Sequence, residues 1–223
     1  MEKLLAAAGV STAPLPGRAM GNSLGLRKRR KHLLKGERTD MLDKYLIAHC
    51  APTLASLKTA NLFSLPFSFQ ADLAAQLSDW NEQLRDKGVI LTMLRQGGGT
   101  ALIYVYRKTH LKADLEKPGV GRFLAGCGYG CTDADQAVEI LKNRFEAGGD
   151  FPHEIGLFLG YPLGDVIGFI RNAGRNSKCT GCWKVYCNAC EARRLFAKFE
   201  KCRDVYVRLW KQGISVRQLT VAA

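Results

Sequence analysis

The sequence contains no long hydrophobic run. No stretch approaches the roughly 18 to 20 uninterrupted apolar residues that a membrane-spanning helix requires. The weakly charged start and the apolar run Leu4 to Val10 are too short for a signal peptide. We therefore expect a cytoplasmic protein with no membrane partner. In that compartment its eight cysteines should be mostly reduced or metal-bound, and they should not form a disulfide framework.

Acidic residues are few compared with basic ones. The chain has 20 Asp and Glu residues against 33 Lys and Arg, which gives a net charge of +13 and favours nonspecific contact with nucleic acid. Residues 1–40 hold nine basic and three acidic residues, and they include a Gly/Pro/Ser-rich run before the basic cluster 27–31. We interpret residues 1–40 as a disordered basic extension, and nucleic-acid binding through residues 27–31 is a hypothesis. The alternative is a dispensable leader or a start codon assigned too early.

The sequence also lacks a phosphate-binding loop. The triple glycine within residues 96–100 is not followed by Gly-Lys-Ser/Thr, and no helix is expected after it. The flanking segments 89–94 and 101–107 are rich in branched and aromatic residues. This pattern predicts an antiparallel hairpin with a flexible glycine turn.

The composition, 47% hydrophobic and 24% charged over 223 residues, suits one sizeable core. We expect a single α+β domain over residues 41–223, with a mixed sheet of roughly four to six strands packed by helices. The domain is expected to end with a long C-terminal helix followed by a last strand. The expected helices are 42–48, 52–57, one capped by Ser68 and ending at Gly88, 110–116, one opened by a capping box at Thr132, one starting at Pro162, and 189–211. The expected strands are 61–65, 89–94, 101–107, 155–160, 183–186 and 215–221.

Four cysteines lie within twelve residues as two Cys-x-x-Cys pairs, Cys179/Cys182 and Cys187/Cys190. Four thiolates near one point suit Zn²⁺ or an iron–sulfur cluster, whereas one pair at a helix start suits disulfide exchange. Residues 183–186 have the composition of a strand, which rises about 3.3 Å per residue and would hold Cys182 and Cys187 about 16 Å apart. One tetrahedral site cannot span that separation, so either the segment loops back or the two pairs act separately.

If the pairs act separately, Cys179 and Cys182 could meet Cys127 and Cys131 of a glycine-rich turn to form a four-cysteine site. The second pair lies between a strand and a helix, with Asn188 as N-cap, which resembles the local context of thioredoxin-like redox motifs. Unreactive cysteines remain the plain alternative.

A nucleophilic site is the other hypothesis. Cys50 lies just ahead of the helix expected to begin at Pro52, where the partial positive charge of a helix start lowers a thiol pKa. His153 would serve as the base, with Glu154 or Asp165 as the orienting carboxylate. The alternative for such a histidine is a structural role with ordinary hydrogen bonds.

The long C-terminal helix is expected to bury one stripe and expose a basic surface. The stripe would include Cys202 as an inert core thiol. The basic surface is interpreted as a solvated face, and binding of nucleic acid or another anion is the alternative. Its residues are Arg193, Arg194, Lys198, Lys201, Arg203, Arg208 and Lys211.

Three segments, 49–63, 151–170 and 181–186, resemble an uncharacterised family, domain of unknown function 3793, found mainly in anaerobic bacteria. The resemblance covers roughly Met41 to Leu219. It implies a soluble intracellular protein and supplies no reaction. Family members begin near the counterpart of Met41, and the pair Cys187/Cys190 is outside the family signature. Cys50, His153, Glu154 and the segment 183–186 fall inside the resembling motifs.

Our leading hypothesis is therefore a thiol-based protein of anaerobic metabolism, either metal-binding with Zn or an iron–sulfur cluster, or redox-active. The rivals are a hydrolase or transferase that uses Cys50 and His153, and a nucleic-acid-binding protein. Whether the protein is an enzyme stays open at this point.

Overall fold

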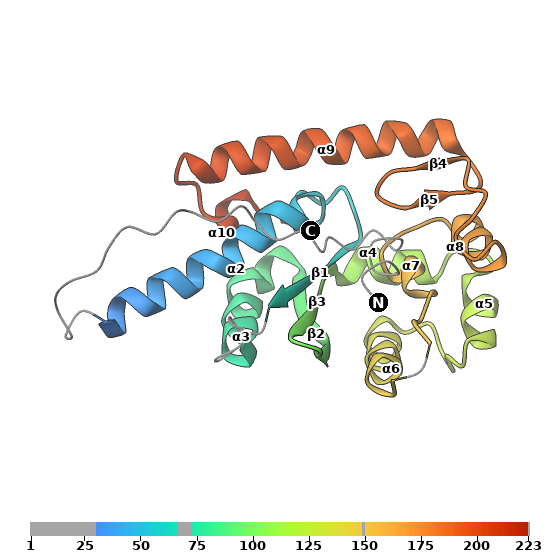
Figure 1. Cartoon of the computed structure of the whole chain (residues 1–223), viewed down its shortest axis with the longest axis horizontal. Helices are drawn as coiled ribbons and strands as arrows, with labels where there is room; N and C mark the ends of the chain where they lie inside the picture. Colours follow the sequence, from blue (N-terminus) through green and yellow to red (C-terminus); the bar gives the residue numbers. More distant parts are fainter. Residues whose placement is uncertain (1–29, 67–72, 149, 223) are drawn as a thin grey trace.

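The computed structural model describes residues 30–66, 73–148 and 150–222, and it has the expected α+β architecture (Figure 1). The first half of the described chain contains the larger sheet. Its elements are α2 (Arg30–Leu54), β1 (Ala60–Pro66), α3 (Leu73–Leu84), the 3₁₀ turn η2 (Arg85–Lys87), β2 (Val89–Gly97), β3 (Thr100–Arg107) and α4 (Lys108–Leu115).

The second half is mainly helical. Its elements are α5 (Val120–Gly126), α6 (Ala134–Glu146), α7 (Ile155–Phe158), α8 (Leu163–Arg171), β4 (Cys179–Thr180), β5 (Lys184–Val185), α9 (Ala189–Lys211) and α10 (Val216–Leu219). No described helix is long and apolar enough to cross a membrane.

The larger sheet has three antiparallel strands in the order β1-β3-β2, so the expected mixed sheet of four to six strands is wrong within the described residues. The central strand β3 is buried on both faces because helices cover each side. Its even-numbered residues, such as Tyr104, point into the cluster with α4–α7, and odd-numbered ones, such as Ile103, point into the cluster with α2 and α3. The predicted hairpin around the triple glycine is confirmed.

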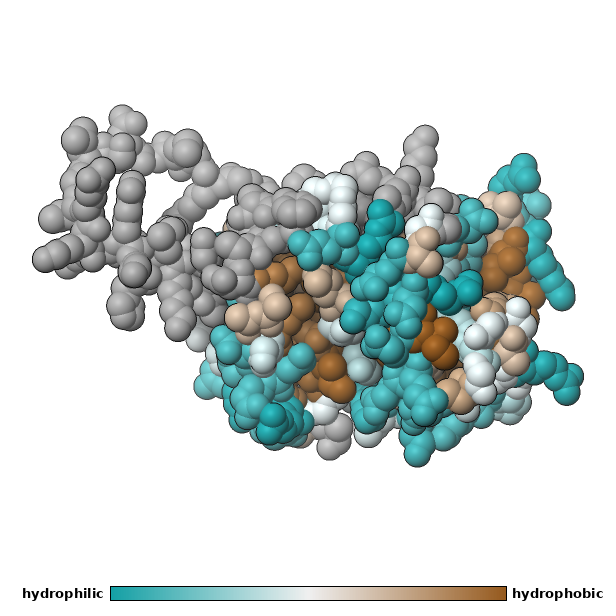
Figure 2. Space-filling view, turned by 90° about the horizontal axis from the view of Figure 1, so that it is seen from below, coloured by the Kyte–Doolittle hydropathy of each residue, from teal (hydrophilic) through white to brown (hydrophobic). Residues whose placement is uncertain are grey.

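Helix α9 lies across the top of the molecule and packs on α2, which covers the sheet beneath it (Figure 1). Its bounds agree with the predicted long helix. Asn188 is its N-cap, with the side-chain oxygen accepting a hydrogen bond from the backbone N–H of Glu191. The face seen from below is mixed: Figure 2 shows hydrophobic residues reaching the described surface in separate patches among hydrophilic ones.

Several predicted elements are wrong. Residues 155–160 are buried but form the short helix α7 and a turn instead of a strand. Residues 215–221 form α10, opened by a capping box on Ser215, instead of a last strand. The helix α6 is capped by Asp133, not by Thr132. The predicted N-cap Ser68 lies outside the described residues.

The first helix differs most from its prediction. The two short helices expected around Pro52 are one helix, which begins at Arg30 and carries Pro52 in its last turn. Its carboxyl end is stabilised by Arg107, which is fully buried and donates to the carbonyls of Thr53 (2.6 Å) and Leu54 (2.7 Å). Residues 30–40, expected to be disordered, belong to this helix. Residues 1–29 lie outside the described residues, so the basic extension there and the role of residues 27–31 stay predictions.

Candidate functional site

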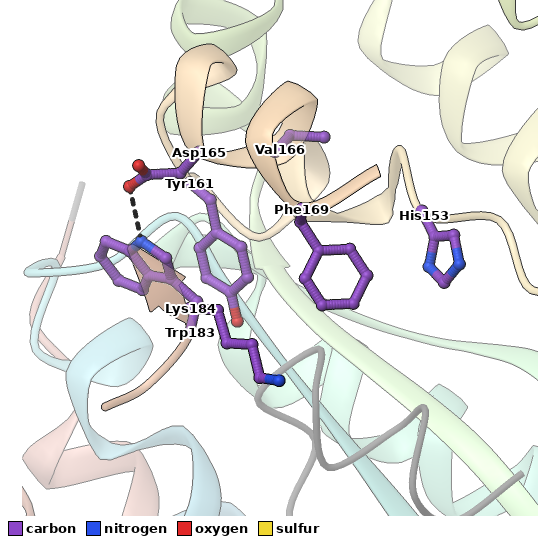
Figure 3. Close-up of a pocket in the computed structure, with 8 residues that line it drawn as sticks. His153, Tyr161, Asp165, Val166, Phe169, Trp183 and Lys184 are labelled. Atoms are coloured by element: carbon purple, nitrogen blue, oxygen red, sulfur yellow. Dashed lines mark hydrogen bonds between the residues drawn. The ribbon is translucent and has the colours of Figure 1, made fainter. Parts of the chain in front are cut away.

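A small cavity lies between α7, α8 and the β4–β5 hairpin (Figure 3). Four rings line it, those of His153, Tyr161, Phe169 and Trp183, together with the side chain of Lys184. We call this set the aromatic cleft. Its cavity volume of about 30 Å³ is enough for only one or two water molecules, since a water needs about 10–15 Å³ by this measure. Any larger occupant must therefore displace a side chain.

The turn between α7 and α8 positions Tyr161. It is tight because Gly160 has a φ of +78°, and a Cβ at this position would collide with Thr59. Thr59 in turn donates a short hydrogen bond to Asp114, so the turn is pinned to the end of α4. Pro162 follows as the N-cap residue of α8. The turn therefore fixes the orientation of the Tyr161 ring relative to α8.

Asp165 joins α8 to the hairpin. It is 3% exposed, and its carboxylate accepts three hydrogen bonds: from the indole Nε1 of Trp183 (2.9 Å), and from the backbone N–H groups of Tyr186 (2.7 Å) and Cys187 (2.8 Å). Both oxygens are thus engaged by donors, and the buried charge is stabilised by them. Asp165 therefore acts in positioning the cleft wall, not as the orienting carboxylate of a histidine.

The close approach of α8 and the hairpin depends on two glycines, four residues apart on one helix face. A Cβ at Gly168 would lie 2.5 Å from Tyr186, and one at Gly164 would overlap the sulfur of Cys187. Glycine thus lets the hairpin backbone come within reach of Asp165.

The rings form two pairs. Tyr161 and Trp183 stack with centroids 4.6 Å apart and planes 23° apart, whereas His153 meets Phe169 edge-on at 5.1 Å. Burial lowers the pKa of His153, which favours the neutral imidazole near pH 7. The ammonium of Lys184 donates to the carbonyl of Gly174 (2.5 Å) at the edge of the cleft.

A larger groove, about 670 Å³, lies between α3, β2 and α4. Its charged side chains are engaged with their own neighbours: Lys108 pairs with Asp135 and Arg85 with Glu82. No ring lines it among the described residues. The aromatic cleft is therefore the better candidate for a ligand site.

A family model with the description "Protein of unknown function (DUF3793)" matches residues 46–220. The chain belongs to this family. No curated protein and no solved structure gives a significant match. The family match includes every residue of the aromatic cleft and all eight cysteines. It confirms the resemblance stated from the sequence.

Within the DUF3793 match, the predicted nucleophile is deeply buried. Cys50 lies inside α2, near its carboxyl end and not ahead of a helix, so the predicted activation by a helix start is wrong. It is 0% exposed, and burial raises the pKa of its thiol far above the ordinary value. Cys50 packs with the cluster of α2 and α3, whereas His153 contacts Phe151 and Phe169. The structure does not bring the proposed thiol and base together.

Glu154 has a separate set of partners. It is buried, and its Oε1 accepts hydrogen bonds from Arg144 Nε (2.6 Å) and from the hydroxyl of Tyr129 (3.2 Å). The cation–π contact between Arg144 and Tyr129 completes a compact cluster that ties α6 to the residues before α7. This arrangement gives Glu154 a structural role.

The cysteines predicted as metal ligands are spread over the DUF3793 region. Residues 179–185 form a hairpin with Cys179 opposite Val185; the strand β5 (Lys184–Val185) lies between Cys182 and Cys187, so the predicted looping back between the two pairs is not seen. Cys187 and Cys190 are exposed at the start of α9. The remaining pair, Cys127 and Cys131, flanks the turn after α5, where the thiol of Cys131 donates to Gln136. Across the described ranges no group of three or more His, Cys, Asp or Glu side chains is placed to hold a metal ion. Zn or iron–sulfur binding stays a prediction.

The sequence analysis did not predict the aromatic cleft. Tyr161, Phe169 and Trp183 lie in segments already singled out, but no spacing rule brings a turn, a helix and a hairpin to one cavity. One signal was available in the sequence, the high local content of aromatic residues and glycine. Residues 151–170 hold three Phe, one Tyr and four Gly residues, a mixture that favours close ring packing.

Proposed function

We propose that this protein binds a small planar anion, such as an aromatic carboxylate, in the aromatic cleft. The observation that carries the proposal is the lining itself: four rings on separate segments face one cavity whose rim holds a lysine. Planar ligands stack well on such rings. Ligand sites are commonly apolar cavities with a few placed polar groups.

The charges at the cleft favour an anion. Asp165 is the carboxylate among the lining residues. Both of its oxygens already accept hydrogen bonds, from the indole of Trp183 and from the backbone of Tyr186 and Cys187. Within the described residues the Lys184 ammonium has one hydrogen bond, to the Gly174 carbonyl, and its long side chain can turn. A bound carboxylate would therefore meet a cation and no free acidic group among the lining residues.

Opening the cleft has a modest cost. Releasing Lys184 from Gly174 breaks one hydrogen bond of a charged donor, worth about 1.5–3 kcal/mol. The same ammonium then pairs with the carboxylate of the ligand, so most of that cost is offset. Stacking on Phe169 or Tyr161 supplies the gain. For a probe as small as benzoate we expect a dissociation constant on the order of 1 mM, equivalent to about −4.1 kcal/mol.

The test is an NMR titration of the full chain with benzoate, following the indole N–H of Trp183, which is bonded to Asp165. Benzyl alcohol and benzylamine, similar in shape but neutral and cationic, are the ligand controls. Lys184→Met should weaken benzoate binding at least about tenfold.

The matched variant is Lys178→Met. Lys178 also belongs to the hairpin region and also donates to a backbone carbonyl, that of Cys187, but it lies outside the cleft. It should leave benzoate binding unchanged. Equal binding of benzoate and benzyl alcohol, or equal losses in the two lysine variants, would contradict the anion proposal.

We propose thiol exchange by Cys187 and Cys190 as a second candidate function. Both thiols are exposed at the start of α9, as the sequence-based hypothesis requires. A dithiol fits better than a metal site because no third ligand lies with them in the described part of the chain. Two measurements distinguish a metal site from thiol exchange. They are zinc and iron analysis after anaerobic purification, and redox titration of the wild type and of Cys187→Ser and Cys190→Ser. Stoichiometric metal lost in both variants would favour the metal site; a two-electron couple lost in both would favour exchange.

A further inference from the structure

Lys58 is a buried lysine that packs against Tyr161, the ring that stacks on Trp183. It follows the end of α2, where its backbone N–H donates to the carbonyl of Pro52 (3.1 Å). It is 8% exposed, and its ammonium lies 5.3 Å from the centroid of the Tyr161 ring. The ring contributes a cation–π contact but no opposite charge.

No carboxylate of the described residues pairs with Lys58. The groups whose charges act on it are the thiols of Cys50 and Cys182 and the guanidinium of Arg203. Among the described residues, neither Lys58 nor Arg203 forms an ion pair. Buried lysines are ordinarily paired, so a second cation in place of a carboxylate is a costly arrangement for a merely structural residue.

Burial lowers the pKa of Lys58 to about 8; Cys182 and Cys50 oppose this shift, and Arg203 adds a smaller lowering of its own. An amine that is desolvated and lies beside another cation is a recognised form of activated nucleophile. At pH 7 the neutral, nucleophilic form of Lys58 is roughly 300-fold more populated than that of a lysine with the ordinary pKa of 10.5.

Arg203 provides a second, independent feature. Its Nε is buried and has no hydrogen-bond acceptor among the described residues. A buried, unsatisfied N–H of a charged group costs about 1–3 kcal/mol, and a carboxylate is the acceptor that matches a guanidinium best. The site thus combines a nucleophilic amine with a donor for an anion.

We propose that Lys58 forms an imine with a small oxo acid whose carboxylate binds Arg203. The neutral amine adds its nitrogen lone pair to the carbonyl carbon, forming the C–N bond as the C=O π electrons move to oxygen. The carbinolamine then loses that oxygen as water, with both amine hydrogens leaving in the water, and a C=N bond remains. No oxidant or reductant takes part in this step. The site borders the aromatic cleft through Tyr161, but the inference does not rest on benzoate binding.

The test uses the full chain with glyoxylate as probe and cyanoborohydride as trap. The trap supplies a hydride and water a proton, so each imine becomes a stable carboxymethyl-lysine. Peptide mass spectrometry measures the labelling rate of every lysine at pH 7. We expect Lys58 to be labelled at least about tenfold faster than the surface lysines, with a rate that rises with pH and levels off above about 8. Labelling of Lys58 no faster than that of surface Lys112 or Lys198 would overturn the proposal.

The substrate class has its own control. Acetaldehyde, similar in size but without the carboxylate, should label Lys58 at least about tenfold more slowly than glyoxylate relative to the surface lysines. Arg203→Gln should remove this difference while leaving a folded protein, checked by circular dichroism and thermal unfolding. Equal preference for the two probes in the wild-type chain would overturn the oxo-acid assignment, and this comparison needs no variant.

Discussion

Replacing Asp165 should destabilise the protein strongly. Asp165→Ala removes the acceptor for three donors, the Trp183 indole and two hairpin N–H groups, and leaves them in a largely buried place. Each stranded donor costs about 1–3 kcal/mol, and water that enters the vacated volume recovers part of this. We expect the free energy of unfolding to fall by about 3–5 kcal/mol, a large fraction of the stability of an ordinary domain.

Asp165→Asn separates charge from shape. The amide oxygen can still accept from the backbone N–H groups of Tyr186 and Cys187, but the amide nitrogen would then face the indole N–H, donor to donor. The loss should be smaller, about 2–3 kcal/mol. Asp79→Asn, on the exposed face of α3, is the matched control and should change stability by no more than about 0.5 kcal/mol.

Urea unfolding followed by far-ultraviolet circular dichroism measures these differences as shifts in midpoint at constant slope. The Asp165 variants should also increase hydrogen exchange in the hairpin before global unfolding, because its attachment to α8 is lost. If Asp165→Ala unfolds within 1 kcal/mol of the wild type, the carboxylate does not hold the hairpin and the account of the cleft is wrong.

Further predictions concern other buried contacts. Arg107→Met should lower stability by about 3–5 kcal/mol in urea unfolding, because four carbonyl acceptors lose their donor. Gly168→Ala should cost about 1–3 kcal/mol through collision with the hairpin, whereas Gly126→Ala, with open space around it, should be nearly neutral. Burial and Arg203 lower the pKa of His49 to about 4 from 6.5, so wild-type stability should fall by up to about 3 kcal/mol as pH drops from 6.5 to 4, and His49→Gln should flatten that slope. Lys58→Met should raise stability at pH 7 by about 1–3 kcal/mol, an advantage that shrinks between pH 8 and 10.5 as the wild-type amine becomes neutral in the unfolded chain too.

Local sequence patterns correctly predicted the elements in which a regular apolar pattern extends over many residues. The stripe of α3 and the bounds of α9 follow from apolar residues at helical spacing, and the central hairpin follows from branched residues around three glycines. Residues 155–160 and 215–221 were predicted as strands because a short apolar run does not distinguish a buried strand from a buried helical turn. Ser215 with Gln218 is a capping box, and this signal correctly indicates a helix at that place.

Long-range contacts explain what the sequence could not predict. Pro52 is a good helix-starting residue, yet α2 continues through it because Arg107, more than fifty residues later, satisfies the carbonyls of its last turn. The same continuity places Cys50 inside the helix and under α9, where it cannot benefit from a helix start. Nothing near Cys50 in the sequence indicates this, so its predicted activation had the wrong sign.

Burial acts in opposite directions on the thiols and on the lysine beside them. Removing water disfavours the charged form, so it raises the pKa of the Cys50 and Cys182 thiols, and the positive charges of Lys58 and Arg203 do not overcome it. For Lys58 the charged form is the protonated one, and burial therefore makes the reactive, neutral amine more populated. The region around Cys50 and Cys182, first considered for thiol chemistry, is thus better suited to amine chemistry at Lys58. Iodoacetamide at pH 7.5 should leave Cys50 and Cys182 largely unmodified while glyoxylate labels Lys58, and the reverse order of reactivity would mean that this desolvation argument fails.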